Sequence, residues 1–210
     1  MSLIFKADQT ILFQGDSITD CARDREDHAG MGNGYASLAA AWLNAARPEL
    51  NLTLLNRGIS GNRAIDLSDR WQKDCLDLKP DWVSILIGVN DTWRRFDSND
   101  PTSTEDYTRH YRDILTRSAA AGMGLIVCEP FLLPVPEDRK AWREDLDPRI
   151  HAARELAREF KAIYVPFDGV FAAASTQRPC EFWAPDGVHP TTAGHALMAR
   201  HWLRAVGLCA

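Results

Sequence analysis

The sequence has no block of basic residues and no apolar run long enough to cross a membrane. Its formal net charge is -5, which argues against nucleic acid or an anionic membrane surface as its main partner. A membrane helix needs about 20 consecutive apolar residues, and the opening segment has neither the basic nor the apolar region of a signal peptide. We therefore expect a cytoplasmic protein that binds no nucleic acid and no membrane.

Cysteine and histidine are present but lack the spacing of disulfide frameworks or metal sites. The chain has five cysteines and no Cys-x-x-Cys pair, at positions Cys21, Cys75, Cys128, Cys180 and Cys209. Free thiols in a reducing compartment explain this pattern best. Four histidines lie in predicted helices without the close clustering that zinc needs, namely His110, His151, His195 and His201. For these four we expect surface or packing roles.

Length and composition favour a single domain over residues 1–210. A chain of 210 residues can bury a substantial core. Hydrophobic residues make up 45% and charged residues 25%, as is typical of soluble globular proteins. No internal repeat, low-complexity segment or linker divides the chain.

Short β-prone apolar runs alternate with segments of helical periodicity. Strands are predicted at residues 11–13, 52–56, 82–87, 125–128 and 163–165. Helices are predicted at about residues 35–47, 64–75, 103–121, 149–160 and 192–206, with a short one near 170–174. The third helix has a capping pair at its start, Ser103 and Asp106. Strands separated by crossover segments of this size imply a parallel sheet with helices on both faces.

The segment 129–147 is rich in proline and charge. Pro130, Pro134 and Pro136 stand near its start, and charged residues are scattered through the rest. This composition predicts a long surface loop, with a helical turn near Trp142. Such a loop would help to shape a pocket for an acyl group or a sugar.

Five residues suited to chemistry follow strand ends or lie in loops. Ser17 follows the first strand, Gly58 the second and Asn90 the third, whereas Asp186 and His189 lie near the C-terminus. The carboxyl ends of parallel strands meet at one edge of a sheet, where such folds bind their ligands. We therefore expect these residues to converge despite their distance in sequence.

Together these residue types suit acyl transfer from an ester. Serine is a poor nucleophile at neutral pH, so Ser17 needs a base, for which His189 is the candidate. Asp186, three residues earlier, can fix the tautomer of His189 and stabilise its imidazolium form. The backbone N–H groups of Ser17 and Gly58 and the side-chain amide of Asn90 can stabilise the oxyanion of a tetrahedral intermediate.

Four sequence blocks in order resemble the SGNH (GDSL) hydrolase superfamily. They are Gly15-Asp16-Ser17, Gly58, Gly88-Val89-Asn90-Asp91 and Asp186-Gly187-Val188-His189. The resemblance implies a flavodoxin-like three-layer α/β/α sandwich with a five-stranded parallel sheet, and no metal or cofactor. It also implies Ser17 as nucleophile, Asp186 and His189 as its partners, and Gly58 and Asn90 in the oxyanion hole.

A narrower resemblance is to the intracellular bacterial acetylxylan esterases of that superfamily. The similar stretches are residues 15–21, 56–62, 79–85 and 90–94. This resemblance implies removal of O-acetyl groups from carbohydrate such as xylo-oligosaccharides, often by a homo-oligomer. The alternatives are a short-chain carboxylesterase or lysophospholipase-type acyl hydrolase and, more remotely, a non-catalytic carbohydrate-binding domain.

Two tryptophans and three polar residues lie beside these blocks. Trp93 and Trp183 are candidates for substrate binding, since an aromatic ring can stack on a sugar, although core packing explains most tryptophans. Asp16, Asn62 and Asp91 are interpreted as groups that fix turns and loops by hydrogen bonds.

Overall fold

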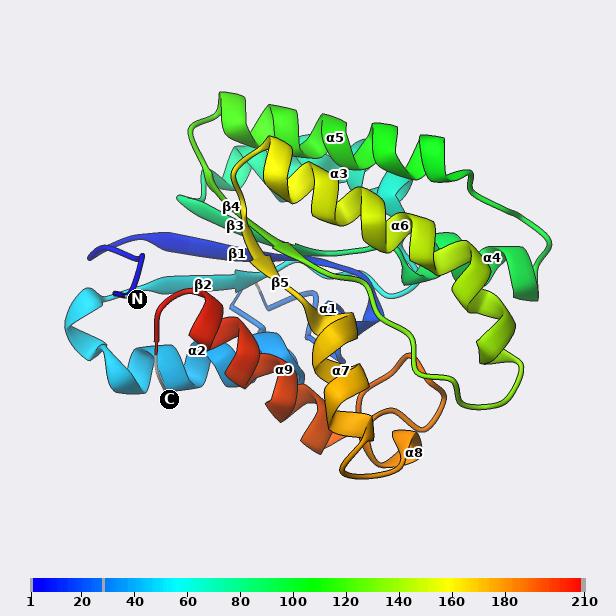
Figure 1. Ribbon diagram of the computed structural model, residues 1–210. Coiled ribbons are helices and arrows are strands. Elements are labelled where there is room, and N and C mark those ends of the chain that lie inside the picture. Colours follow the sequence, from blue (N-terminus) through cyan, green and yellow to red (C-terminus); the bar gives the residue numbers. More distant parts are fainter. Residues whose placement is uncertain (1, 28, 209–210) are drawn as a thin grey trace.

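Residues 2–27 and 29–208 are described here in a computed structural model (Figure 1). Within them, one parallel sheet has the strand order β2-β1-β3-β4-β5. The strands are β1 (Thr10–Gly15), β2 (Thr53–Asn56), β3 (Trp82–Leu86), β4 (Gly124–Cys128) and β5 (Ile163–Val165). The predicted five-stranded parallel sheet is therefore confirmed.

Helices cover both faces of the sheet. The α-helices are α1 (Ser17–Asp20), α2 (Tyr35–Ala46), α3 (Ala64–Asp74), α4 (Val89–Asp97), α5 (Thr104–Ala120), α6 (Arg139–Glu159), α7 (Phe167–Ser175), α8 (Cys180–Trp183) and α9 (Thr192–Ala205), and two 3₁₀ turns span Pro48–Leu50 and Leu76–Leu78. Figure 1 shows α3, α5 and α6 on one face and α2, α7 and α9 on the other. This is the expected three-layer sandwich. None of the helices in the described ranges is long and apolar enough to cross a membrane.

Alternate residues of β1 fill two separate cores. Ile11 and Phe13 pack in the core beneath α2 and α9, whereas Leu12 packs in the core beneath α3 and α5. All three are fully buried, as expected for a central strand whose two faces are both covered. Because Gly15 pairs with Leu86 and Phe13 pairs with Asn56, the three strands end together.

The prediction of a surface loop over residues 129–147 is wrong from Arg139 onwards, although the helical turn expected near Trp142 lies within a helix. Helix α6 already begins at Arg139 and contains Pro148. Its buried positions recur at helical spacing: Trp142, Leu146, Ile150, Ala153 and Leu156. In the sequence, the prolines and charged residues between these positions made the helical spacing hard to recognise. A proline inside a helix removes one backbone hydrogen bond, and burial of the apolar face offsets that loss. The loop before α6 is itself partly core, since Phe131 is fully buried.

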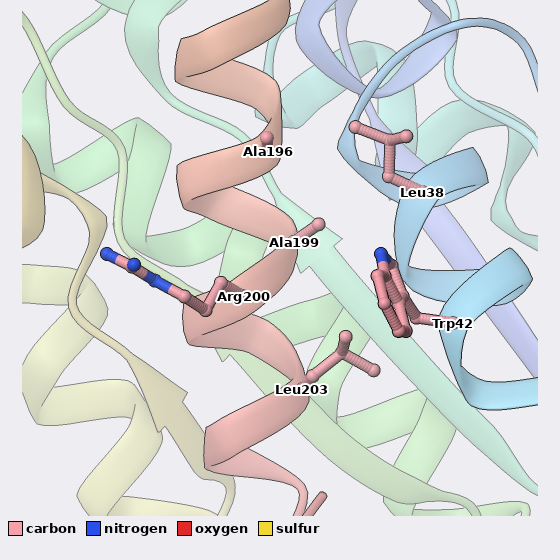
Figure 2. Close-up of a pocket in the computed structure, with 6 residues that line it drawn as sticks. All are labelled: Leu38, Trp42, Ala196, Ala199, Arg200 and Leu203. Carbon is pink, nitrogen blue, oxygen red and sulfur yellow. The ribbon is translucent and has the colours of Figure 1, made fainter. Parts of the chain in front are cut away.

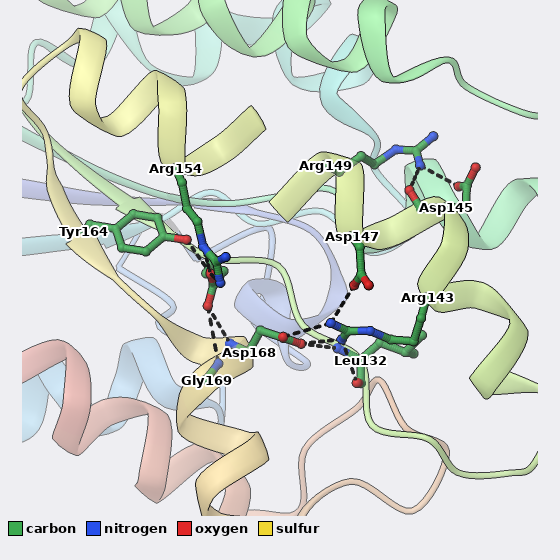
Figure 3. Close-up of polar contacts among 10 residues, drawn as sticks. Leu132, Arg143, Asp145, Asp147, Arg149, Arg154, Tyr164, Asp168 and Gly169 are labelled. Atoms are coloured by element: carbon green, nitrogen blue, oxygen red, sulfur yellow. Dashed lines mark hydrogen bonds and ion pairs between the residues drawn. The ribbon is translucent and has the colours of Figure 1, made fainter. Parts of the chain in front are cut away.

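Two arginine clusters tie α6 to the ends of β4 and β5 (Figure 3). The buried carboxylate of Glu129 accepts hydrogen bonds from Arg154, from the Tyr164 hydroxyl and from the backbone N–H of Asp168. Arg143 makes two hydrogen bonds to the Asp168 carboxylate, at 2.6 and 3.0 Å. Partial burial makes these charge-assisted contacts stronger than exposed ion pairs. Through Arg154 they hold α6 against the end of β4, and through Arg143 they hold it against the start of α7.

Other differences from the prediction are smaller. The helices α1, α4 and α8 were not predicted. Cys21, Cys75, Cys128 and Cys180 are free thiols, as predicted. Cys209 lies outside the described residues.

Replacing Ser103 with alanine should destabilise the fold modestly. The Ser103 hydroxyl accepts the backbone N–H of Asp106 at 3.0 Å and donates to the Asp106 carboxylate, as the sequence predicted. Loss of an N-cap of this kind costs about 1 kcal/mol, measurable as a lower free energy of unfolding in urea. Ser175→Ala is the control, because that exposed hydroxyl donates to the Ala172 carbonyl near the other end of a helix. An equal loss in both variants would contradict the capping role.

Candidate active site

Ser17 lies at a sharp turn from β1 into α1. A Cβ atom on Gly15 would lie 2.3 Å from the Leu86 carbonyl oxygen, so only glycine allows so close an approach. Asp16 caps α1 by accepting the Ile18 backbone N–H at 3.0 Å. As the first residue of α1, Ser17 has no carbonyl one turn earlier in the helix to receive its own N–H. That N–H therefore remains a donor at the sheet edge.

Ser17, His189 and Asp186 form one hydrogen-bonded chain. The Ser17 Oγ lies 2.9 Å from His189 Nε2, and His189 Nδ1 lies 2.6 Å from Asp186 Oδ2. With the proton on Nδ1 donated to Asp186, the free lone pair of Nε2 faces the serine hydroxyl. This arrangement can accept the Ser17 proton and hold the resulting positive charge.

The turn from Asp186 to His189 is stabilised by hydrogen bonds within the turn. The Oδ1 atom of Asp186 accepts the backbone N–H groups of Val188 at 3.0 Å and His189 at 2.7 Å. Gly187 has a φ of 81°, a conformation that other residues rarely adopt. A Cβ atom there would lie 2.3 Å from the Val135 carbonyl oxygen. The glycine thus allows the loop before α6 to pack directly on this turn.

The electrostatics favour an ionised Asp186 beside a basic His189. Partial burial works to raise the pKa of Asp186, but hydrogen bonds from the His189 side chain and from two backbone N–H groups outweigh it and lower the pKa to about 2. The hydrogen bond to Asp186 raises the pKa of His189 above its ordinary value, against the opposing effect of burial. Asp16 is different, since burial raises its pKa to about 7.

The three expected oxyanion donors differ in their present hydrogen bonds. One N–H of the Asn90 amide donates to the Asn62 carbonyl at 3.0 Å, which orients the amide and leaves its second N–H. The backbone N–H of Gly58 donates to the Asn56 side chain at 2.8 Å. It could reach an oxyanion only by sharing that bond. The Ser17 N–H has no such competing bond within α1.

Gly58 also has a purely structural reason to be glycine. A Cβ atom on it would lie 2.4 Å from the backbone nitrogen of Asp20. The side chain of Asn56 joins the same strands and turns, because its amide donates to the Thr19 carbonyl at 2.6 Å while its oxygen accepts from Gly58. No role was assigned to Asn56 from the sequence, although it stands in the block quoted there. Its burial at the end of β2 is the feature that gives it this role.

The two candidate tryptophans lie in different surroundings. The ring of Trp93 lies 5.7 Å from the His189 ring, beside the hydrogen-bonded chain. The indole N–H of Trp183 donates to the Ala174 carbonyl, and its ring packs edge-on against Phe182. Trp183 helps to line a cavity of about 400 Å³ against α9. Sugar contact by either ring stays a prediction.

The polar residues interpreted as loop-fixing groups make such contacts. Asp91 is buried and accepts the backbone N–H of Ala64 at the start of α3. The side chain of Asn62 accepts a hydrogen bond from Arg70 at 2.8 Å. The Asp91 bonds connect the segments that follow β3 and β2, whereas the Asn62 bond holds the loop after β2 against α3.

His195 has a packing role, as predicted. It is buried, and its Nδ1 accepts the backbone N–H of Tyr35 at 3.1 Å. Its other ring nitrogen lies 3.4 Å from the Cys21 sulfur. Burial lowers the pKa of His195 to about 4, so the ring is neutral at physiological pH. No group of three or more His, Cys, Asp or Glu side chains in the described ranges could hold a metal ion.

An apolar cavity of about 320 Å³ lies between α2 and α9, away from these groups (Figure 2). It is lined by Leu38, Trp42, Ala196, Ala199, Arg200 and Leu203. Trp42 is 61% exposed. None of the predicted site residues lines this cavity, so it gives no reason to move the candidate site from Ser17.

A family model and a curated relative match most of the chain. The model describes the GDSL-like lipase/acylhydrolase family and matches residues 13–197. An acetylxylan esterase from Geobacillus stearothermophilus is 35% identical over 208 residues, which cover 95% of this chain and 94% of the relative.

Solved structures match over almost the whole length. The crystal structure of an acetylxylan esterase from Geobacillus stearothermophilus superposes with a TM-score of 0.90 and 32% identity, covering 99% of this chain and 97% of that one. An α/β-hydrolase enzyme from the metagenome of Lake Arreo superposes with a TM-score of 0.93 and 34% identity over 100% of both chains. Two other structures of the Geobacillus enzyme are of catalytic mutants in which a serine and an aspartate are replaced.

An NMR titration of the histidine rings should separate His189 from His195. His189 should titrate above the ordinary histidine value of about 6.5, because Asp186 stabilises its protonated form. His195 should titrate near 4, because burial penalises its charge. Replacing Asp186 with Asn removes the stabilising carboxylate and should lower the pKa of His189 while leaving that of His195 unchanged. An unmoved His189 would contradict the pairing.

Proposed function

The chain belongs to the GDSL-like lipase/acylhydrolase family, and from that premise we propose that it removes O-acetyl groups from carbohydrate through an acyl intermediate on Ser17. The family makes the chain a carboxylic ester hydrolase whose substrate is an acylated molecule. The finer assignment is to acetylated xylo-oligosaccharides, and relatives named acetylxylan esterases support it.

One observation carries the mechanistic proposal. The Ser17 Oγ is within hydrogen-bond distance of His189 Nε2, and His189 is bonded in turn to an ionised Asp186. A general base must lie within about 2.6–3.2 Å of the heavy atom that carries the proton it removes. His189 meets this condition at 2.9 Å.

Acylation then follows from this geometry. His189 takes the Ser17 proton as Oγ attacks the acetyl carbonyl carbon, and the carbonyl electron pair moves to oxygen. When the tetrahedral intermediate collapses, the bond to the sugar oxygen breaks and His189 gives its proton to that oxygen. The products of this step are acetyl-Ser17 and a free sugar hydroxyl.

Deacylation repeats the sequence with water. His189 removes a proton from a water molecule, which attacks the acetyl carbonyl, and the Ser17 oxygen leaves and recovers a proton from His189. Acetate is released. The oxyanion of both steps is stabilised by the Asn90 amide and the Ser17 N–H, and by the Gly58 N–H if it shares its bond to Asn56.

Ser17→Ala should abolish ester hydrolysis and leave the fold intact, because the small side chain fits and only the nucleophile is lost. We would measure acetate release from acetylated xylo-oligosaccharides and from an aryl acetate, using wild type and variant side by side. Release from both substrates by wild type alone is the expected result. Release from the aryl ester alone would reject the sugar substrate in favour of a short-chain carboxylesterase, and a variant with wild-type rate would reject the serine mechanism.

Asn90→Ala should lower kcat by about 10²–10³, the usual cost of removing one oxyanion donor. Asn62→Ala is the matched control, because Asn62 holds the Asn90 amide through its backbone carbonyl, which that substitution keeps. The control loses the hydrogen bond from Arg70 to the Asn62 side chain but keeps the Asn90 amide, so its kcat should fall less than about tenfold. Equal losses in the two variants would show that the loop, not the Asn90 amide, is what matters.

A further inference from the structure

Arg139 contacts the turn that carries His189 in two places. Its Nε donates to the Asp186 backbone carbonyl at 3.3 Å. Its aliphatic stem packs on Gly187, since a Cβ atom there would lie 3.4 Å from Arg139 Cγ. The arginine is the first residue of α6 and its side chain is only 13% exposed, with Asp138 as its ion-pair partner.

The guanidinium of Arg139 covers two indole rings. It lies 3.8 Å from the ring centroid of Trp142 and 5.1 Å from that of Trp93. These two rings pack edge to face with centroids 5.3 Å apart. A cation at these distances is attracted to the faces of the rings, and only a planar guanidinium can at the same time keep an Nε donor for the Asp186 carbonyl.

Trp93 lies between the Arg139 guanidinium and the residues His189 and Asn90 of the candidate site. Its ring lies 5.7 Å from the His189 ring. It stands on α4 three residues after Asn90, so the two side chains are neighbours on the helix surface. Contacts to Arg139, Trp142 and His189 thus surround the ring of Trp93.

We propose that Arg139 and Trp93 form a clamp that holds the Asp186–His189 turn in register with Ser17 and Asn90. The inference rests on the proposed function, and both side chains act as positioning residues for ester hydrolysis. The His189 side chain is 46% exposed, so few of its own contacts limit its movement. The clamp would supply that restraint. It also gives Trp93 a role other than that of a sugar platform.

Arg139→Met tests the clamp by keeping the length of the stem while removing the charge, the planar group and the Nε donor. Lys140→Met is the matched control one residue along α6, where the lysine is exposed and pairs with Glu137 at the surface. For an aryl acetate, kcat should fall on the order of ten- to a hundredfold in Arg139→Met, since small misplacements of a catalytic group have effects of this size. The KM should be unchanged, and the control should match wild type.

A second variant and a spectroscopic reading make the test decisive. Arg139→Lys keeps a cation and a long stem, so its fold is preserved, yet it should show the same loss because lysine has neither the Nε donor to Asp186 nor the planar group. In both variants, the NMR signal of the Nδ1 proton that His189 shares with Asp186 should broaden by exchange with water. In the Lys140→Met control this signal should remain sharp.

Three outcomes would overturn the clamp. In the first, Arg139→Met and Lys140→Met have equal kcat values. In the second, the His189 proton signal stays sharp in both Arg139 variants. In the third, Trp93→Leu raises the KM for acetylated xylo-oligosaccharides and leaves kcat for the aryl acetate unchanged, which would make Trp93 a sugar contact. The NMR reading needs no substrate, so failure of the proposed function would remain distinguishable from failure of the clamp.

Discussion

The pairing of β1 with its two neighbours is the constraint on which the site depends. Parallel register ends β1, β2 and β3 at the same edge, with Gly15 opposite Leu86 and Phe13 opposite Asn56. Gly15 lies so close to the Leu86 carbonyl that the chain must turn there without a side chain. A one-residue shift of register would move the turn that carries Ser17 relative to the loops that follow β2 and β3, and would also exchange the two buried faces of the strand.

From that edge, the site is assembled by polar side chains that join one loop to the next. Asn56 connects the end of β2 to α1, and Asp91 connects α4 to the start of α3. Most of these groups are buried, where an unpaired polar atom would be costly. The loops are therefore held in one arrangement by hydrogen bonds that would be lost together. Such rigidity is what a preorganised oxyanion site requires.

Much of the fold and of the candidate site could be predicted from the sequence. The strands and most of the helices follow from local periodicity, and in α5 the buried Tyr107 and Tyr111 are spaced four residues apart, as on one helix face. Prediction failed for residues 139–147, where the buried positions of α6 are separated by charged residues and Pro148 follows. A helix of this kind is stabilised by tertiary contacts, including those of Arg143 and Arg154, which local propensity does not reveal.

The sequence by itself determined the features that depend on residues close together in the chain. These are the glycine at Gly15, the spacing of Asp186 and His189, and the order of the four blocks. The convergence of Ser17, Gly58 and Asn90 at one edge was also predictable, because parallel strands impose it on residues at their carboxyl ends. Only the tertiary structure decided that Gly58 already donates its N–H to Asn56 and that Arg139 reaches both the Asp186 turn and Trp93. Side-chain direction and competition for a hydrogen bond depend on residues distant in sequence. Local sequence patterns therefore do not predict which of these side chains come into contact.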